Sequence, residues 1–191
     1  MPFPHELLVL RHGQTRWNAE GRWQGRLNSP LTPLGIRQAT RQGEILAGLD
    51  LSGLAAFSSP SGRAIETAGI AVAPHLDPVR TDDRLMEIDV GRWSGRLRGE
   101  LMPMRPDEEF GDEALDLYWG APGGEGPGPL RARCTAFLGG LRGPAVLVCH
   151  GITGRMLRAV ALGLGDDALG DLPGGQGVVH RIAGGAQEVL R

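Results

Sequence analysis

Short continuous runs of apolar residues predict the strands of this chain. Leu7 to Leu10 is one such run and Ala145 to Cys149 is another, and each leads into a His-Gly pair. Unbroken hydrophobicity over four to eight residues is typical of strands that are buried on both faces. Further strands are predicted at residues 54–58, 79–81, 177–182 and 186–190.

Apolar residues at helical spacing predict the segments between these strands. Thr32 provides an N-cap and Pro33 a first-turn proline for a helix that runs to about residue 48. Its inner face is expected to carry Ile36, Ala39, Gly43 and Leu46. Other helices are expected over residues 61–72, 107–118, 130–141 and 151–162.

The alternation of strands with helices indicates the fold class. We predict an α/β fold, a three-layer α/β/α sandwich with a mostly parallel central sheet. The chain has 191 residues and shows no repeat or linker, so a single domain over residues 1–191 is expected. Within it, the irregular stretch at about residues 96–126 is predicted to be a lid-like insertion over the functional site.

The charge composition excludes several classes of function. All 20 basic residues are Arg, because the chain contains no Lys. A Walker-type phosphate loop and a pyridoxal Schiff base both require a lysine, so neither is possible here. The formal net charge of -2 gives no broad basic field, and no nucleic-acid partner is expected.

Cysteine usage and the N-terminal sequence bear on cofactors and compartment. Cys134 and Cys149 lack metal-like spacing, so neither a zinc site nor a disulfide is expected. The N-terminus has no basic region, and its apolar run is too short for a membrane span. We predict a cytoplasmic protein with no membrane partner, no metal and no other cofactor.

Two histidines occupy equivalent positions at the ends of predicted strands. His12 follows the first apolar run and His150 follows the second, and each precedes a glycine. In open α/β sheets, ligands bind beyond the carboxyl ends of the strands, so both imidazoles enter one crevice if the strands are neighbours. A single strand-end histidine is more often a core or capping residue. Arg11 beside His12, and Arg63 on the first turn of a neighbouring helix, make a shared site the stronger interpretation.

These residue types suit phosphoryl transfer. Guanidinium groups bind phosphate oxygens in a bidentate manner, and helix N-termini add backbone N–H donors. A neutral imidazole, such as that of His12, can attack phosphorus directly. The departing alkoxide then needs a proton from a carboxylic acid whose pKa burial or negative charge has raised. Glu87 is the leading candidate because apolar residues surround it, and Asp89 and Glu20 are the alternatives.

The same residues resemble the histidine phosphatase superfamily, in the branch that includes cofactor-dependent phosphoglycerate mutase, and most of all its small phosphatases. The similarity extends over nearly the whole chain, in residues 8–18, 21–39, 58–68, 85–95, 123–125 and 146–151. It implies that His12 becomes phosphorylated and that Glu87 donates the proton. It also implies that the phosphoryl oxygens are held by Arg11, Arg63 and His150. Family positions that contact the phosphoryl group or substrate correspond to Asn18, Gln24, Gly25 and Gly151.

Departures from the family pattern favour hydrolysis over isomerisation. Ser94 stands where Glu is common and Gly126 where Ser is common, and both changes are compatible with activity. Mutases of the family carry a longer insertion and a Lys that holds the phosphoglycerate, and this chain has neither.

The predicted function is hydrolysis of a small phosphorylated metabolite through a phosphohistidine intermediate. A cofactor-dependent phosphoglycerate mutase is one alternative, and a catalytically silent phosphate-binding or scaffold protein is another. Specificity is expected to depend on residues 96–126, where Arg96, Arg98 and Arg105 either contact a second anionic group or are surface charges. The sequence gives no indication of the oligomeric state.

Overall fold

A computed structural model describes residues 2–101 and 115–191 of the chain. Its sheet has the strand order β3-β2-β4-β1-β5-β6. The strands are β1 (Leu7–Arg11), β2 (Ala55–Ser58), β3 (Val79–Thr81), β4 (Ala145–Cys149), β5 (Val179–Ala183) and β6 (Ala186–Leu190). Strands β3, β2, β4 and β1 run parallel, whereas β5 pairs antiparallel with β1 and β6 pairs antiparallel with β5.

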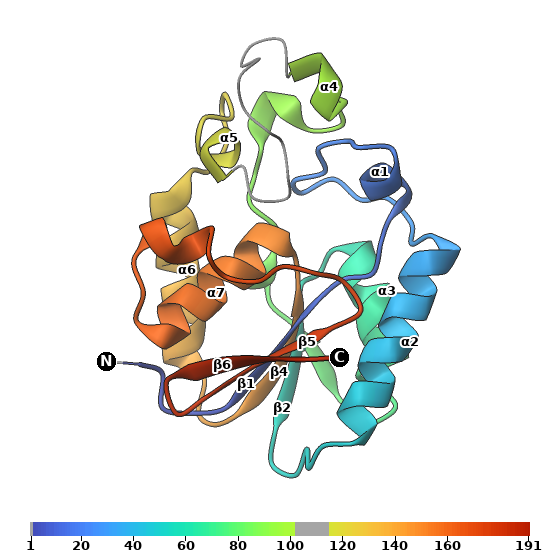
Figure 1. Ribbon diagram of the computed structural model, residues 1–191, viewed down its shortest axis with the longest axis vertical. Coiled ribbons are helices and arrows are strands. Elements are labelled where there is room, and N and C mark those ends of the chain that lie inside the picture. The colour runs from blue at the N-terminus through green and yellow to red at the C-terminus, as the bar shows by residue number, and fades with distance from the viewer. Residues whose placement is uncertain (1, 102–114) are drawn as a thin grey trace.

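Helices cover both faces of this sheet (Figure 1). On one face lie α2 (Pro33–Ala47) and α3 (Gly62–Ala71), and on the other α6 (Pro127–Gly140) and α7 (Gly151–Leu162). The short helices α1 (Arg16–Ala19), α4 (Arg98–Leu101) and α5 (Leu115–Trp119) lie beyond the carboxyl ends of the parallel strands. Three 3-10 turns are η1 (Asp83–Leu85), η2 (Gly91–Trp93) and η4 (Asp166–Leu169). The predicted three-layer α/β/α sandwich is confirmed.

Alternation along the central strands divides the core into two layers. Leu7 and Val9 of β1 pack with α6 and α7, whereas Leu8 and Leu10 pack with α2 and α3. Successive side chains of a strand point to opposite faces, so a strand covered on both sides must be apolar throughout. This is the physical reason for the unbroken apolar runs in the sequence.

The inner face of α2 differs from the prediction at one position. Ile36 is 44% exposed, whereas Ala39, Gly43 and Leu46 are buried as expected. The buried position near the middle of the helix is taken by Gln42, whose amide donates to Arg11 O and Val178 O, both at 3.0 Å. A hydrophobicity pattern cannot anticipate a glutamine that is buried because two strand-end carbonyls need donors.

The start of α6 also differs from expectation. Helix α6 begins at Pro127 rather than near residue 130, since proline is well suited to the first turn of a helix and Gly126 precedes it with a φ of 73°. Of the helix expected at residues 107–118, only α5 falls within the described residues, and residues 102–114 lie outside them. In the described part of the chain, no helix combines the length and hydrophobicity that a membrane-spanning segment needs.

Candidate active site

Strands β1 and β4 are neighbours, and this brings the two strand-end histidines together. Arg11 pairs with Cys149 in the register, and the backbone N–H of His12 donates to Cys149 O at 3.0 Å. The rings of His12 and His150 lie 5.2 Å apart between centroids. Both side chains are buried. The two imidazoles thus lie side by side beyond the carboxyl ends of β1 and β4, as neighbouring strands would place them.

The hydrogen bonds of His12 fix which ring nitrogen carries the proton. Nδ1 lies 2.7 Å from Gly13 O, and because a carbonyl only accepts, Nδ1 is the protonated nitrogen. Burial lowers the pKa of His12 well below 6.5, and the nearby Arg63 and Arg11 charges lower it further. His12 is thus a neutral imidazole with its lone pair on Nε2, which is the form that can act as a nucleophile.

Arg63 holds a fixed positive charge against that lone pair. Its Nε donates to His12 Nε2 at 3.2 Å, and its terminal nitrogens donate to Leu27 O at 2.6 Å and Gly25 O at 2.9 Å. The side chain is 1% exposed, and burial is the main reason why its pKa falls to about 10, which leaves it cationic at neutral pH. Within the described residues no carboxylate forms an ion pair with it. Gly25, with a φ of 50°, shapes the loop that supplies both carbonyls.

His150 is held from a third strand. Its Nε2 lies 2.8 Å from Ser59 Oγ, directly after β2, and its Nδ1 is buried with no hydrogen-bond partner among the described residues. Burial lowers the pKa of His150 well below 6.5, and Arg63 and His12 add to this effect. A neutral His150 with one uncommitted ring nitrogen is suited to contact an oxyanion or its proton.

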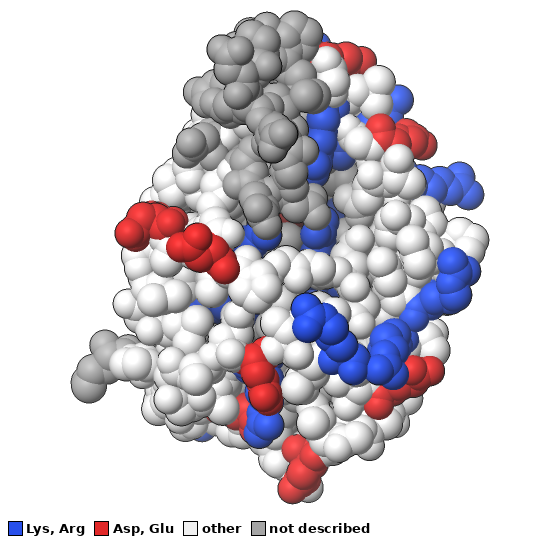
Figure 2. Space-filling model, in the orientation of Figure 1, with Lys and Arg blue, Asp and Glu red and all other residues white. Residues whose placement is uncertain are grey.

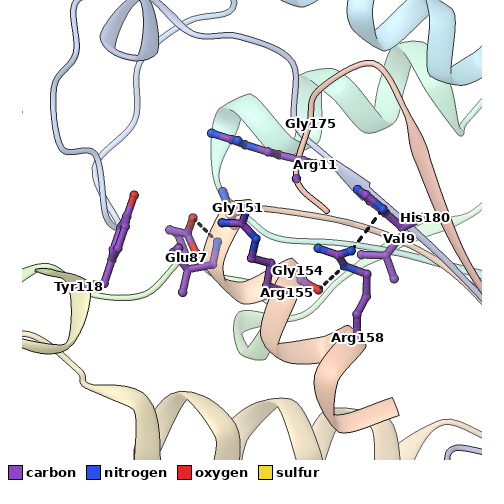
Figure 3. Close-up of a pocket in the computed structure, with 13 residues that line it drawn as sticks. Val9, Arg11, Glu87, Tyr118, Gly151, Gly154, Arg155, Arg158, Gly175 and His180 are labelled. Atoms are coloured by element: carbon purple, nitrogen blue, oxygen red, sulfur yellow. Dashed lines mark hydrogen bonds between the residues drawn. The ribbon is translucent and has the colours of Figure 1, made fainter. Parts of the chain in front are cut away.

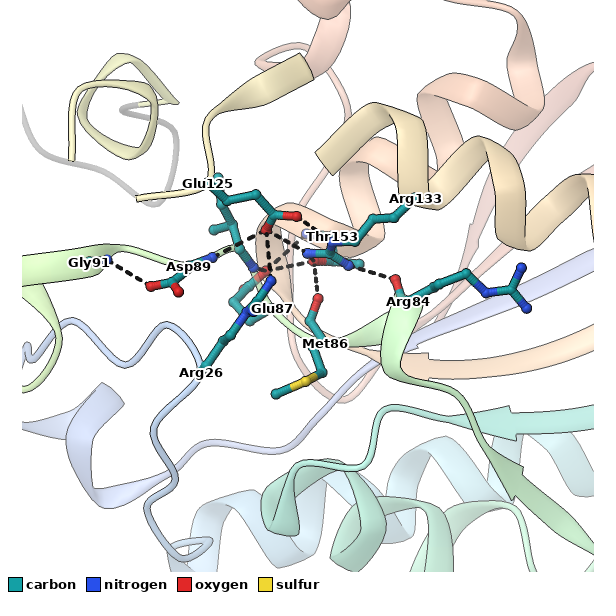
Figure 4. A network of polar contacts seen from close by, with 10 residues as sticks. Arg26, Arg84, Met86, Glu87, Asp89, Gly91, Glu125, Arg133 and Thr153 are labelled. Atoms are coloured by element: carbon teal, nitrogen blue, oxygen red, sulfur yellow. Dashed lines mark hydrogen bonds and ion pairs between the residues drawn. The ribbon is translucent and has the colours of Figure 1, made fainter. Parts of the chain in front are cut away.

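Glu87 sits at the N-terminus of α7 (Figure 4). Its carboxylate accepts from the backbone N–H of Thr153 at 3.0 Å and of Ile152 at 3.3 Å, and from Thr153 Oγ1 at 3.0 Å. The helix N-terminus after Gly151 was expected to offer its N–H groups to a bound anion. Instead, two of them orient Glu87 together with the Thr153 hydroxyl.

A second layer of polar contacts supports Thr153 and the segment that carries Glu87 (Figure 4). Arg133 bonds Glu125 at 2.6 Å and also lies 3.5 Å from Thr153 Oγ1. Glu125 accepts from the backbone N–H of Asp89 at 3.3 Å. The charge of Arg133 keeps the pKa of Glu125 low against the opposing effect of burial. This network fixes the loop on both sides of Glu87.

The structure separates Glu87 from its two rivals. Glu20 is 50% exposed and pairs with Arg22 at 2.8 Å, and Asp89 accepts from the backbone N–H of Gly91 at 2.8 Å. Neither is among the described residues that line the hollows around His12 and His150, whereas Glu87 lines both. The carboxyl group that accompanies the histidines is therefore that of Glu87.

Two adjoining hollows are lined by the residues that the sequence predicted as catalytic or substrate-binding. The histidine pocket, about 370 Å³ including its open mouth, is lined by Arg11, His12, Asn18, Gln24, Gly25, Arg63 and Glu87 among others. The α7 pocket, about 450 Å³ by the same measure, is lined by Arg11, Glu87, His150 and Gly151 together with residues of α7 and β5. Figure 2 shows basic side chains along the hollow near the centre of one face.

Several contributors were not anticipated from the sequence. Gln176 donates to His12 O at 2.9 Å from a glycine-rich loop before β5, and Ser59 and Thr153 hold His150 and Glu87. Of the arginines proposed for a second anion, Arg98 lines the histidine pocket, whereas Arg96 pairs with Glu100 at 3.4 Å on the surface. Arg105 lies outside the described residues. No cluster of three or more His, Cys, Asp or Glu arranged for a metal ion occurs among residues 2–101 and 115–191.

Comparison with known proteins gives a consistent result. Residues 7–188 match the profile of the histidine phosphatase superfamily, branch 1. The chain is 34% identical over 170 residues to the glucosyl-3-phosphoglycerate phosphatase of Mycolicibacterium vanbaalenii, which covers 83% of this chain and 74% of that protein. It is 38% identical over 117 residues to the 2,3-bisphosphoglycerate-dependent phosphoglycerate mutase of Bifidobacterium longum, which covers 60% of this chain and 46% of the mutase.

A solved structure of a mycobacterial glucosyl-3-phosphoglycerate phosphatase, in complex with VO3, superimposes with a TM-score of 0.81 at 30% identity, over 97% of this chain and 96% of that one. The fold, the order of the motifs and the profile match agree across nearly the full length. The chain therefore belongs to the histidine phosphatase superfamily.

Proposed function

We propose that this chain is a metal-independent phosphomonoester hydrolase that acts on a small phosphorylated metabolite through a phosphohistidine intermediate. The observation that carries the proposal is the state of His12, a buried neutral imidazole whose Nε2 lone pair faces the Arg63 guanidinium. Glu87 is held in the same pocket by the first amides of α7. A nucleophile, a fixed cation and a carboxyl group thus line one cavity.

The first half-reaction transfers the phosphoryl group to His12. Nε2 attacks phosphorus, the bond to the ester oxygen breaks with its electron pair, and the departing oxygen takes a proton from Glu87. Arg63 Nε, which donates to Nε2, turns its N–H toward a phosphoryl oxygen as the lone pair is used. Arg11 and His150 contact the remaining oxygens from the ends of β1 and β4.

The second half-reaction returns the group to water. Glu87, now a carboxylate, removes a proton from a water molecule that attacks phosphohistidine, and inorganic phosphate leaves. Asn18 and Gln24 line the pocket beside His12, and the backbone of Gly25 and Gly151 borders the two hollows. We assign these four residues to contacts with the phosphoryl group or the substrate.

Hydrolysis is favoured over the mutase alternative by the cations that line the pocket. All of them are Arg, since the chain has no Lys to hold a phosphoglycerate in the manner of the mutases. The full set of His12, His150, Arg63 and Glu87 argues against a silent phosphate-binding scaffold. Product analysis with a phosphoglycerate separates the possibilities: released phosphate supports the proposal, and isomerised phosphoglycerate without released phosphate contradicts it.

The proposal extends to the domain organisation, a lid over the pockets and the cellular compartment. We infer that residues 1–191 form one domain, that the segment at about 96–126 closes over the two pockets, and that the protein works in the cytoplasm. The position of α4 and α5 beyond the carboxyl ends of the strands supports the second of these inferences.

The decisive experiment measures aryl phosphate turnover in the presence of a metal chelator. The purified wild-type chain is expected to hydrolyse p-nitrophenyl phosphate under these conditions, and His12→Ala is expected to fall to the uncatalysed rate. His75→Ala is the matched control, because His75 is exposed after α3 and far from the site in sequence and fold. Activity that appears only when metal is added, or an active His12→Ala variant, contradicts the mechanism.

A further inference from the structure

The α7 pocket extends away from the histidines along one helix. Beyond Glu87 and Gly151 it is lined by Arg155 and Arg158 of α7 and by His180 of β5. Figure 3 shows both arginine side chains rising from α7 toward β1 and β5. The three side chains are between 2% and 3% exposed. None of them has a part in the proposed transfer to His12.

Arg158 is a buried cation whose hydrogen-bond partners are all neutral. Its Nε donates to Gly154 O at 3.1 Å, and its Nη1 donates to Gln187 Oε1 at 2.8 Å and to His180 Nδ1 at 3.2 Å. Across residues 2–101 and 115–191, no carboxylate lies within ion-pair distance of it. A buried guanidinium without a counter-charge is costly to fold, so a bound anion would stabilise this end of the pocket.

His180 adds a neutral donor to the same wall. Because a guanidinium only donates, His180 Nδ1 accepts from Arg158, and Nε2 must carry the ring proton. Burial, followed by the Arg158 and Arg155 charges, lowers the pKa of His180 to about 3, so the ring stays neutral over the physiological range. The acidic group at the mouth, Glu87, already accepts from α7 amides. The inner end of the pocket therefore presents donors and positive charge.

The loop before β5 approaches these arginines closely. A Cβ on Gly174 would lie 2.9 Å from Arg155 Nη2, and Gly175 has a φ of 123° that other residues rarely adopt. Glycine at both positions lets the backbone close the far side of the pocket. The backbone of this loop thus forms one wall of the pocket.

The dimensions of the pocket relate it to the catalytic end. Arg158 follows Gly151 by two turns of α7, which is about 10 Å along the helix axis. His180 pairs with Val9, three residues before His12 on β1, which is again about 10 Å. A group held by Arg158 is therefore several bonds away from a phosphoryl group on His12.

We propose that the inner end of the α7 pocket, at Arg155, Arg158 and His180, is an oxyanion subsite that binds a second acidic group of the substrate, a carboxylate or a phosphate. The inference rests on the proposed phosphatase function and defines its substrate class as metabolites with two separated acidic groups. A free inorganic oxyanion has the same chemistry and is distinguished by the second arm of the test.

The first arm compares ω-carboxyalkyl phosphates of increasing length with alkyl phosphates of the same length. In the wild-type protein, the carboxylate is expected to lower KM by about ten- to a hundredfold at the best length, as for a hydrogen bond to a charged group. Arg158→Gln should abolish this preference and leave kcat for the alkyl phosphates within about twofold. Arg41→Gln, which removes an exposed arginine of α2, should keep the preference.

The second arm needs no catalysis and therefore separates this inference from the proposed function. The melting temperature is followed against sulfate concentration in the wild type, Arg158→Gln and Arg41→Gln. A stabilisation by sulfate that is reduced only in Arg158→Gln supports the subsite, and with unchanged KM values it assigns a free oxyanion as the occupant. If Arg158→Gln does not fold, Arg158→Met fills a similar volume without a buried polar group. A folded variant with wild-type carboxylate preference and wild-type sulfate response overturns the subsite.

Discussion

At the scale of single residues, the two proposed reacting groups, His12 and Glu87, lie in contrasting surroundings. His12 is kept neutral because burial and two nearby arginines oppose its protonation. Glu87 is instead surrounded by donors, from the first amides of α7 and the Thr153 hydroxyl, which suit a carboxylate. The site thus has a nucleophile with a free lone pair beside a carboxyl group that donors hold in place.

Glu87→Gln tests this division of roles. The amide keeps the size of the side chain but cannot donate or remove a proton, so kcat/KM for an alkyl phosphate is expected to fall by about 10²- to 10⁴-fold. For p-nitrophenyl phosphate the first step should suffer much less, because p-nitrophenolate is a stable leaving group. Stopped-flow assays should then show a burst of nitrophenolate as phosphohistidine accumulates. Equal losses for both substrates would show that Glu87 acts only in binding.

The sequence indicated which strand ends and helix start meet at the candidate site better than it indicated the residues that support them. His12, His150 and Arg63 follow from strand ends and a helix start, because the topology of a parallel sheet collects such positions. Thr153 and Gln176 could not be found in this way, and the position of Ser59 directly after β2 does not by itself identify it as the partner of His150. Their roles depend on hydrogen bonds between segments far apart in the chain, and no local pattern marks a serine, threonine or glutamine for that purpose.

At the scale of elements, the loop after β1 is fixed by backbone contact with α2. A Cβ on Gly35 would lie 2.1 Å from Gln14 O, and one on Gly13 would lie 2.2 Å from Gly35 O. The helix start and the His12 loop approach each other so closely that neither position accepts a side chain. The position of His12 therefore depends on glycine in an element that carries no reacting group.

Gly35→Ala is expected to lower the free energy of unfolding by about 2 kcal/mol or more, because backbone has to move to admit the methyl group. Gly69→Ala is the matched control: Gly69 is exposed in α3, with no atom within 4 Å of its would-be Cβ. Alanine there should raise the free energy of unfolding by about 0.5–1 kcal/mol through better helix propensity. Urea denaturation measures both. A neutral Gly35→Ala would contradict the packing of the His12 loop on α2.

Hydrophobic pattern located the strands and the main helices because burial on two faces imposes it. The pattern was wrong about Ile36, because it does not show which edge of an apolar stripe faces solvent. It also missed the buried Gln42, whose amide donates to two carbonyls. The start of α6 was also missed. Pro127, the first residue of α6, stands between two glycines, and a segment rich in glycine and proline also fits a loop.

At the scale of the whole molecule, the interior holds cations and neutral imidazoles together. Arg63, Arg155 and Arg158 are buried, and so are His12, His150 and His180. Each of these histidines has a pKa lowered by burial first and by arginine charges afterwards. The positive charge in the interior therefore comes from the arginines, whereas the histidines stay neutral. The same arrangement makes folding stability sensitive to acid.

Folding stability is expected to fall as the pH drops below the pKa of about 6.5 that a histidine has in the unfolded chain. In the unfolded chain the three histidines take up protons near pH 6.5, whereas in the folded chain they stay neutral well below it, to about 3 for His180. The unfolded state therefore binds more protons, and stability is lost as pH falls below about 6.5. Three such groups give a slope of up to about 4 kcal/mol per pH unit. Melting temperature should fall steeply between pH 6.5 and 5, in the absence of phosphate.

Carboxylates do not account for a loss in this window. Asp82 and Glu125 also have lowered pKa values, but their contribution is retained above their unfolded values and is lost only under more acidic conditions, below about pH 4.5. His180→Gln should thus make the fall of stability with decreasing pH about a third less steep, because one of the three histidines that take up a proton on unfolding is removed. His75→Gln, an exposed histidine, should leave the slope as in the wild type. A melting temperature that is constant from pH 7 to 5 would mean that the three imidazoles take up protons without unfolding, and that the buried cations do not hold them neutral.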